Sequence, residues 1–192
     1  MRRIILASKS RARKKLLAQI GLKVEIAVPD IREKRLLKSS CRDLVIANAL
    51  IKAKSVAGHF AAAVVIAADT LVTASGEIIG KPKNKRDAFN TLRILSKKPQ
   101  WVYTGLAVID VAAGKVFTAC GKTKVYMRRL TEQQIRSYLK RVSVLDKAGS
   151  FDIQGPGGIF IERIEGCFYN VVGLPLSKLT KILEKLGVDI FK

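Results

Sequence analysis

Apolar residues recur with two different periods along this chain. Short apolar or alternating runs predict strands, at residues 4–6, 23–28, 64–67, 71–73, 77–79, 101–111, 115–127, 159–164 and 168–172. Helical spacing predicts helices, at residues 13–20, 42–57, 85–96, 132–140 and 176–186. The last two strands are expected to form a hairpin that turns near Gly166. This mixture predicts an α/β fold in which helices pack around a long, largely antiparallel mixed sheet.

Polar residues at the predicted helix starts support these boundaries. Ser40 and Asn84 can act as N-caps, and residues 131–134 form a capping box. The run 64–67 is fully apolar, so it is expected to be a buried strand that ends at Asp69. No repeat or linker interrupts the pattern. Residues 1–192 are therefore expected to form a single domain, or two small lobes around a shared core.

The charge of the chain indicates which molecules it could attract. Its 36 basic and 15 acidic residues give a net charge of +21, which predicts attraction to polyanions. The basic residues are spread along the chain, and no zinc-finger or RNA-recognition signature accompanies them. A solvated basic surface and a nucleic-acid partner therefore both remain open.

The cysteines, the histidine and the apolar stretches argue against several kinds of metal site and membrane segment. The three cysteines lie far apart, and the single histidine excludes a metal site built from several histidines. The apolar residues after Arg3 are too few for a signal peptide. The longest apolar stretch, 60–68, is far shorter than the roughly 20 residues of a membrane span. We therefore expect a cytoplasmic protein without membrane association.

Three polar segments carry the candidate chemistry. The first follows the strand at 4–6 and opens a helix, where Ser8 and Ser10 can donate to phosphate oxygens and Arg13 adds a cation. A helix N-terminus also attracts anions. The segment is therefore either a phosphate site or a helix cap beside a solvated basic face.

The second segment holds Asp69, Thr70 and Lys81. A carboxylate delivered by a buried strand suits a general base or a magnesium ligand; alternatively it caps a turn. Lys81 precedes Pro82, which can hold the lysine toward a site; alternatively it is a surface lysine.

The remaining candidates are Glu33, Lys52 and Gln154. Glu33 stands among basic neighbours, either as their ion-pair partner or as a second metal ligand. Lys52 lies on the mostly apolar face of the helix at 42–57, so it requires an anion, either a carboxylate or a substrate phosphate. Gln154 lies in the third segment, a glycine-rich loop; its amide can read the edge of a base, unless the loop is only a turn.

Taken in order, these segments resemble the Maf family of nucleoside triphosphate pyrophosphatases over essentially the whole chain. The matching motifs are Leu6-Ala7-Ser8-Lys9-Ser10 with Arg13, Glu33, Lys52-Ala53, Ala68-Asp69-Thr70-Leu71-Val72, Gly80-Lys81-Pro82, Asp146-Lys147-Ala148-Gly149, Ile153-Gln154-Gly155 and residues 171–176. The resemblance implies an ITPase-like fold with two lobes around a central cleft. It also implies a cytoplasmic, often homodimeric enzyme that uses a divalent metal, Mg²⁺ or Mn²⁺.

The implied reaction is hydrolysis of a nucleoside triphosphate between the α and β phosphates, a nucleotide-pool housecleaning step that yields a nucleoside monophosphate and pyrophosphate. Asp69 matches the family's proton acceptor and, with Glu33, would hold the metal. The residues expected to hold the triphosphate are Ser8, Ser10, Arg13, Lys52 and Lys81.

Positions 12, 70 and 154 match those that separate the branches of the family. Thr70 and Gln154 match the branch acting on dTTP and UTP, and do not match the branch acting on 7-methyl-GTP. Ala12 departs from the pattern, because the dTTP/UTP branch usually reads Ser-Pro-Arg-Arg where this chain reads Ser10-Arg11-Ala12-Arg13. Either Arg11 replaces the missing cation or the substrate has changed. A second hypothesis is a basic nucleic-acid or partner-binding protein, linked to cell-division arrest, that has lost catalysis on this scaffold.

Overall fold

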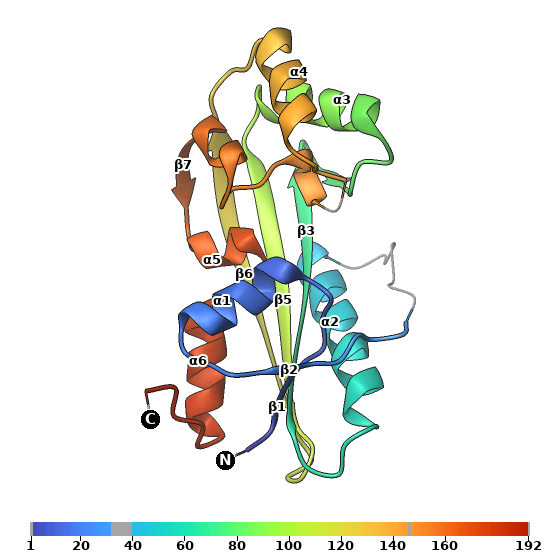
Figure 1. The fold of residues 1–192 in the computed structure, drawn as a ribbon, viewed down its shortest axis with the longest axis vertical. Helices are drawn as coiled ribbons and strands as arrows, with labels where there is room; N and C mark the ends of the chain where they lie inside the picture. The colour runs from blue at the N-terminus through green and yellow to red at the C-terminus, as the bar shows by residue number, and fades with distance from the viewer. Residues whose placement is uncertain (1, 32–39, 146, 192) are drawn as a thin grey trace. The chain divides into compact units, whose positions relative to one another are not determined.

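The computed structural model of the protein describes residues 2–31, 40–145 and 147–191 (Figure 1). Seven strands form one sheet in the order β2-β1-β3-β5-β6-β7, with β4 paired to β3. The strands are β1 (Ile4–Leu6), β2 (Glu25–Ile26), β3 (Val64–Ala74), β4 (Glu77–Ile79), β5 (Gln100–Asp110), β6 (Lys115–Met127) and β7 (Ile161–Glu165). The α-helices are α1 (Arg11–Gln19), α2 (Cys41–Ala57), α3 (Lys85–Leu95), α4 (Glu132–Arg141), α5 (Phe168–Val172) and α6 (Leu176–Lys185). Two 3₁₀ turns, η1 (Ala148–Ser150) and η2 (Pro156–Phe160), complete the described elements.

The chain divides into two compact units that interleave in sequence. Unit 1 comprises Met1–Asp69, Thr104–Gly121 and Gly173–Lys192, and unit 2 comprises Thr70–Tyr103 and Lys122–Val172. Strands β3, β5 and β6 contribute residues to both. The sheet is mixed, as predicted, because β1 pairs in parallel with both β2 and β3, whereas β3–β4 and β6–β7 are antiparallel.

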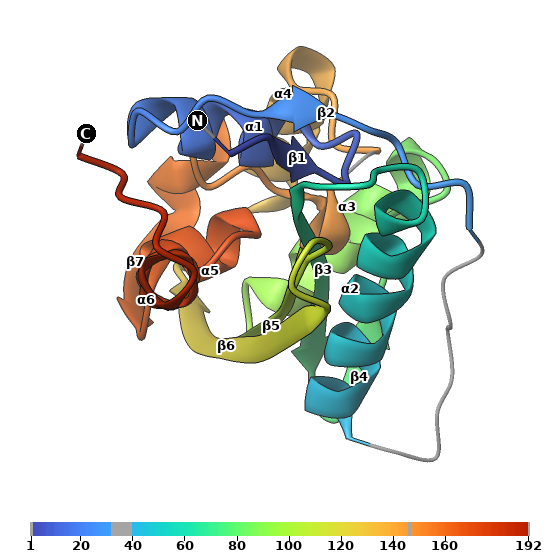
Figure 2. The ribbon, with the colours of Figure 1, turned by 90° about the horizontal axis from the view of Figure 1, so that it is seen from below.

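The core of unit 1 forms where α2 packs on the sheet. Its buried residues include Ile5, Ala49, Ala53 and Val65, and Figure 2 shows α2 lying alongside β3. Small residues permit this close packing. At Gly105 of β5 a Cβ atom would overlap the backbone of Val45 in α2, so only glycine fits there.

The core of unit 2 gathers around α3 and α4, which lie side by side (Figure 1). Its buried residues include Leu92, Leu95 and Ile135. The ring of Tyr138 meets that of Phe160 edge-on, with centroids 4.9 Å apart, which is a favourable aromatic geometry. This cluster supports the loop that carries Gln154, because the Tyr138 hydroxyl accepts a hydrogen bond from the Asp152 amide of that loop.

The predicted helices are confirmed, and so are their caps. Ser40 accepts from the Asp43 amide at 3.2 Å and Asn84 from the Asp87 amide at 2.9 Å. Thr131 and Gln134 form both bonds of the capping box. The first helix begins two residues before its predicted start, at Arg11, because Ser10 caps it.

Three strand predictions were wrong. β3 is one strand of 11 residues, so Asp69 lies inside it and does not end it; a carboxylate is tolerated there because α2 supplies partners. Residues 168–172 form a helix, and β7 pairs with β6 rather than with them. Asn170 of α5 is buried and donates to the Val102 carbonyl at 3.0 Å, a tertiary contact that overrides the strand-like sequence. The strand at 23–28 shrinks to Glu25–Ile26, which is exposed.

No helix in the described part of the chain is long and apolar enough to cross a membrane.

Candidate active site

The loop between β1 and α1 is organised by Ser8, Ser10 and Arg13. Ser10 has an extended backbone, and its Oγ accepts from the Arg13 amide at 3.4 Å. The Oγ of Ser8 accepts from the Ser10 amide and from Arg13 Nη1, each at 3.2 Å. Because Ser8 Oγ accepts both bonds, its own hydroxyl hydrogen remains a donor for an acceptor such as a phosphate oxygen.

Arg13 is fixed at its other side as well. Its Nε donates to the carbonyl of Gly173 at 2.8 Å, which ties α1 to the segment before α6. The guanidinium has five N–H donors in a rigid fork. Two bonds therefore orient the group within unit 1 rather than leaving it as a solvated surface charge.

A buried polar cluster joins α2 to β3. Lys52 Nζ donates to Asp69 Oδ1 at 2.7 Å, and Asn48 Nδ2 donates to Asp69 Oδ2 at 3.0 Å. All three residues are buried: Lys52 is 7% exposed, Asp69 8% and Asn48 3%. Asn48 and Lys52 are four residues apart on α2, so they lie on one face of the helix.

The cluster gives Lys52 and Asp69 partners inside the protein. Lys52 forms an ion pair with the Asp69 carboxylate. Burying two charges is costly unless they are paired and further hydrogen-bonded; Asn48 supplies such a bond here. Asp69 therefore does not cap a turn, since it is a fixed buried carboxylate with one donor on each oxygen.

The serine loop follows the end of β1, which pairs in parallel with the part of β3 that precedes Asp69. Leu6 pairs with Ile66, and the Ala7 amide donates to the Ile66 carbonyl at 2.8 Å. Ser8 comes two residues after Leu6, and Asp69 comes three residues after Ile66. Unit 1 brings together a hydroxyl, a guanidinium, a carboxylate and an ammonium group, which is the set needed to bind a phosphate and orient a water molecule.

A second set of predicted residues belongs to unit 2. The Gly149 amide donates to the Gly80 carbonyl at 3.5 Å, so Lys81 lies next to η1. Gln154 is exposed, and its backbone amide donates to Asp152 Oδ1 at 3.1 Å. Both Gly149 (φ 79°) and Ser150 (φ 60°) have left-handed backbone conformations; for serine this is strained.

The predicted site residues therefore fall into two groups. Unit 1 holds Ser8, Ser10, Ala12, Arg13, Lys52 and Asp69, and unit 2 holds Thr70, Lys81 and Gln154. Thr70 follows Asp69 in β3 and is half-buried, whereas Lys81 is exposed. Ala12 lies in the first turn of α1 beside the exposed Arg11. Glu33 lies outside the described residues.

Sequence reasoning missed Asn48 and Tyr138. The signal for Asn48 was available, because a polar residue four positions before Lys52 on an apolar helix face is in register to share its partner. Tyr138 gave no such signal. Its Oη accepts from the Asp152 amide at 3.1 Å, a contact between segments far apart in sequence. Burial raises the pKa of the Tyr138 phenol, so at neutral pH the group is neutral.

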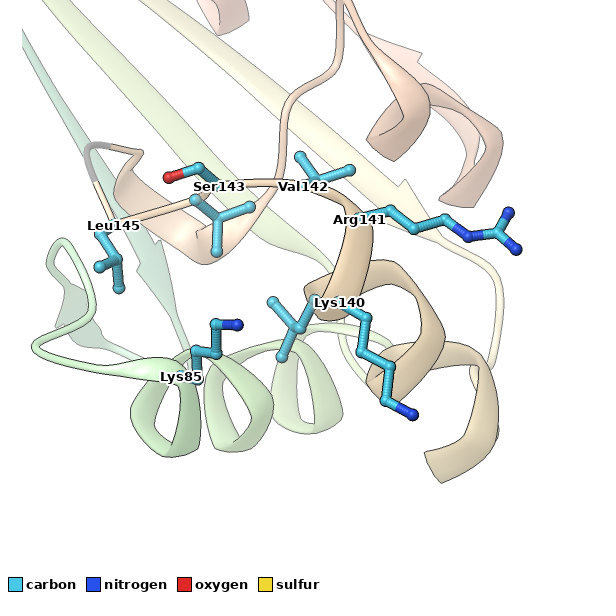
Figure 3. Close-up of a pocket in the computed structure, with 8 residues that line it drawn as sticks. Lys85, Lys140, Arg141, Val142, Ser143 and Leu145 are labelled. Carbon is cyan, nitrogen blue, oxygen red and sulfur yellow. The ribbon is translucent and has the colours of Figure 1, made fainter.

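Two shallow basic hollows in unit 2 contain none of the predicted site residues. One, of about 200 Å³, is lined by the end of α4, the following loop and Lys85 of α3. Figure 3 shows Lys85, Lys140 and Arg141 around it. The other is lined by Lys83, Arg86 and neighbours at the start of α3. Within residues 2–31, 40–145 and 147–191, no three histidine, cysteine or acidic side chains gather as a metal site would require.

Known proteins are similar in sequence to this chain over nearly its whole length. The family model described as "Maf-like protein" matches residues 3–186. A dTTP/UTP pyrophosphatase of Methanosarcina barkeri is 44% identical over 193 residues, covering 100% of this chain and 98% of the relative. A protein of the same description from Bacillus anthracis is 44% identical, covering 99% and 98%. A solved dITP/XTP pyrophosphatase of Mycobacterium abscessus, 18% identical, aligns over 99% of this chain and 100% of its own with a TM-score of 0.45, a loose likeness. On the family match and these identities, the chain belongs to the Maf family.

Proposed function

We propose that this protein is a nucleoside triphosphate pyrophosphatase that hydrolyses dTTP and UTP to the nucleoside monophosphate and pyrophosphate. The observation that carries the proposal is the buried Lys52–Asp69–Asn48 cluster beside the serine loop of unit 1. Membership of the Maf family, with relatives named dTTP/UTP pyrophosphatases, supplies the reaction class.

The serine loop would hold the triphosphate. Ser8 offers its hydroxyl hydrogen, and Arg13 adds a guanidinium charge that its bonds to Ser8 and Gly173 hold in place beside that hydroxyl. The N-terminus of α1 adds the positive end of the helix dipole. Because these groups are already oriented, they stabilise charge on the leaving pyrophosphate without reorganising during the reaction.

Asp69 would position and deprotonate the attacking water. Each of its oxygens has one donor from α2 and a further lone pair to accept from water. The water oxygen bonds to the α phosphorus, the bond to the β-phosphate oxygen breaks, and pyrophosphate leaves with that electron pair. Lys52 balances the charge of the carboxylate, and Asn48 holds its plane, so we assign Asn48 a positioning role.

The carboxylate oxygens of Asp69 are suitable ligands for a divalent cation. Mg²⁺ prefers carboxylate oxygens and is often bound through one or two carboxylates together with substrate phosphates. Asp69, with Glu33 as a second ligand, would hold Mg²⁺ or Mn²⁺. When bound, such an ion neutralises negative charge on the phosphate oxygens.

Base selection is assigned to unit 2. Thr70 and Gln154 would contact the base, Gln154 through an amide that can both donate and accept. Lys81 would add positive charge toward the phosphates. The side chain of Ala12 carries no charge or donor, so either Arg11 supplies the cation expected there from one position earlier, or the enzyme works without it. We further propose that the enzyme acts in the cytoplasm as a homodimer, as the family resemblance implies; light scattering on the purified protein tests the dimer.

A nucleotide panel tests the proposed function. The purified protein is incubated with Mg²⁺ or Mn²⁺ and dTTP, UTP, CTP, modified pyrimidine triphosphates or 7-methyl-GTP, and pyrophosphate is measured separately from phosphate. Pyrophosphate from dTTP and UTP is the expected result and would show that Arg11 compensates for Ala12. Turnover of 7-methyl-GTP alone would keep the reaction class and make position 12 the specificity determinant. No turnover by folded protein would reject the enzyme assignment.

A further inference from the structure

One face of the sheet in unit 2 combines aromatic rings with cations. Trp101 and Tyr103 come from β5, Lys122, Lys124 and Tyr126 from β6, and Arg163 and Glu165 from β7, three strands that are neighbours in the sheet (Figure 1). Lys124 pairs with Glu165 in register, and Tyr126 lies near Arg163. We call these seven residues the aromatic–basic face.

The aromatic–basic face is open, unlike the opposite face of the same strands. Val102 of β5 and Val125 of β6 alternate with the residues of this face and are buried in an apolar cluster. On the aromatic–basic face, Lys122 is exposed, and the side chains of Arg163 and Glu165 are 61% and 48% exposed. The three aromatic residues are half-buried.

Cations and rings alternate in direct contact across the strands. Lys122 Nζ lies 4.0 Å from the Trp101 ring centroid and 5.5 Å from that of Tyr103. Lys124 Nζ lies 5.5 Å from the Trp101 centroid and 5.0 Å from that of Tyr126. Arg163 covers the Tyr126 ring at 3.9 Å. Both lysines therefore lie within reach of an aromatic plane, on flexible stems that can also reach an anion.

The charge of the face is not balanced internally. Its one carboxylate, Glu165, is engaged by Arg163 at 3.0 Å and by the Tyr126 hydroxyl at 2.9 Å. Across the part of the chain that the structure describes, neither Lys122 nor Lys124 forms an ion pair. Lysine is also a poor strand former, and exposed cation–π contacts contribute only about 0.5–1 kcal/mol each. Sheet stability alone therefore gives little reason for two unpaired lysines here.

From this arrangement we infer that the aromatic–basic face binds single-stranded nucleic acid. Aromatic rings on an open sheet stack with unpaired bases, and nearby cations follow the phosphates. Trp101 and Tyr103 are two residues apart on one strand, roughly 7 Å, which allows separate bases to contact each ring. A duplex would meet only the cations, because its bases are already stacked. The high net charge of +21 attracts the strand from a distance.

The sole tryptophan of the chain makes the face directly observable. Trp101 is that residue, so stacking of a base on it changes the intrinsic fluorescence of the full-length protein. The probe is fluorescein-labelled (dT)₁₅, titrated while anisotropy reports binding and tryptophan fluorescence reports stacking. The matched duplex (dT)₁₅·(dA)₁₅ serves as a control for charge alone. We expect (dT)₁₅ to quench Trp101 strongly and the duplex to leave its emission nearly unchanged.

Matched variants distinguish binding by the aromatic–basic face from binding by the basic surface in general. Lys122→Gln/Lys124→Gln should weaken (dT)₁₅ binding about tenfold and lower the slope of log K against log salt by about 1.4. Lys181→Gln/Lys185→Gln removes two exposed lysines from α6 and should have a much smaller effect. Trp101→Leu should weaken binding by a similar factor without changing the salt slope. The melting temperature of each variant confirms folding.

Equal losses in the two lysine pairs, or binding without quenching of Trp101, would overturn the assignment in favour of a diffuse basic surface. The readout needs neither metal nor turnover, so its failure is independent of the failure of the proposed pyrophosphatase activity.

Discussion

The two groups of predicted site residues are held in different ways. In unit 1, Asp69 is buried and receives a side-chain donor on each oxygen, while Arg13 is tied at two atoms. In unit 2, Lys81 and Gln154 are exposed, and the hydrogen bonds near them fix the backbone of their loops rather than their side chains.

This difference matches two chemical tasks. Groups that stabilise a transition state work best when they are oriented in advance and shielded from water. Groups that read a base can be exposed, since a small change in their contacts changes the substrate and not the reaction. We therefore expect substitutions in unit 1 to reduce turnover and stability, and substitutions in unit 2 to change the preference among nucleotides.

The largest effect is expected from Asp69→Asn. The amide cannot take a proton from water, so kcat should fall by about a thousandfold. The fold should persist with reduced stability, because Lys52 loses its counter-charge but an amide can still accept a hydrogen bond from it. Circular dichroism and steady-state kinetics with dTTP measure both properties. Glu184→Gln, an exposed carboxylate-to-amide change in α6, is the control; an active, folded Asp69→Asn protein would remove Asp69 from the mechanism.

Lys52→Met should give the largest loss of stability. The substitution leaves the Asp69 carboxylate buried without its cation, which costs about 3–5 kcal/mol of unfolding free energy. Urea denaturation measures the loss, and Lys54→Met on the exposed side of α2 is the control. Combining Lys52→Met with Asp69→Asn should restore most of the stability but no activity. A double variant as unstable as the sum of the single variants would show that the pair is not coupled.

Gln154→Glu should change specificity with little effect on stability. Replacing the amide by a carboxylate removes two donors at an exposed position. The ratio of kcat/KM values for dTTP and 7-methyl-GTP should therefore change by about tenfold, the size of one altered hydrogen bond. Gln133→Glu, exposed in α4, makes the same charge change away from the loop. An unchanged ratio would exclude Gln154 from base recognition.

Tyr138→Phe should give the smallest effect. It removes the acceptor of the Asp152 amide and so loosens the loop before Gln154, at a cost of about 1 kcal/mol. KM should rise more than kcat falls. Burial raises the pKa of Tyr138 above its ordinary value of 10.0, so its stabilising contribution is complete below pH 10 and is lost as pH rises through the folded-state pKa. The phenylalanine variant should lack that alkaline loss; thermal melts from pH 8 to 11 would show whether it does.

Local signals in the sequence predicted the helices well. Caps such as Ser40 and Thr131 act within one turn of their own position, so their residue types suffice. The requirement of Lys52 for an anion was also readable, because a lysine on an apolar helix face cannot remain unpaired.

Features that depend on distant contacts were not predictable in this way. Asp69 resembled a strand end because its partners, Asn48 and Lys52, come from another element. Residues 168–172 resembled a strand because the contact that anchors α5, from Asn170 to Val102, spans 68 positions. The sequence thus predicted elements with local signals, such as capped helices, more reliably than elements that depend on contacts between distant segments.

Hydrolysis of dTTP in ¹⁸O-labelled water tests the central claim most directly. If water oriented by Asp69 attacks the α phosphorus, one labelled oxygen appears in dTMP and none in pyrophosphate, and mass spectrometry of the two products shows this in a single experiment. Label in pyrophosphate, or release of phosphate instead of pyrophosphate, would contradict the account.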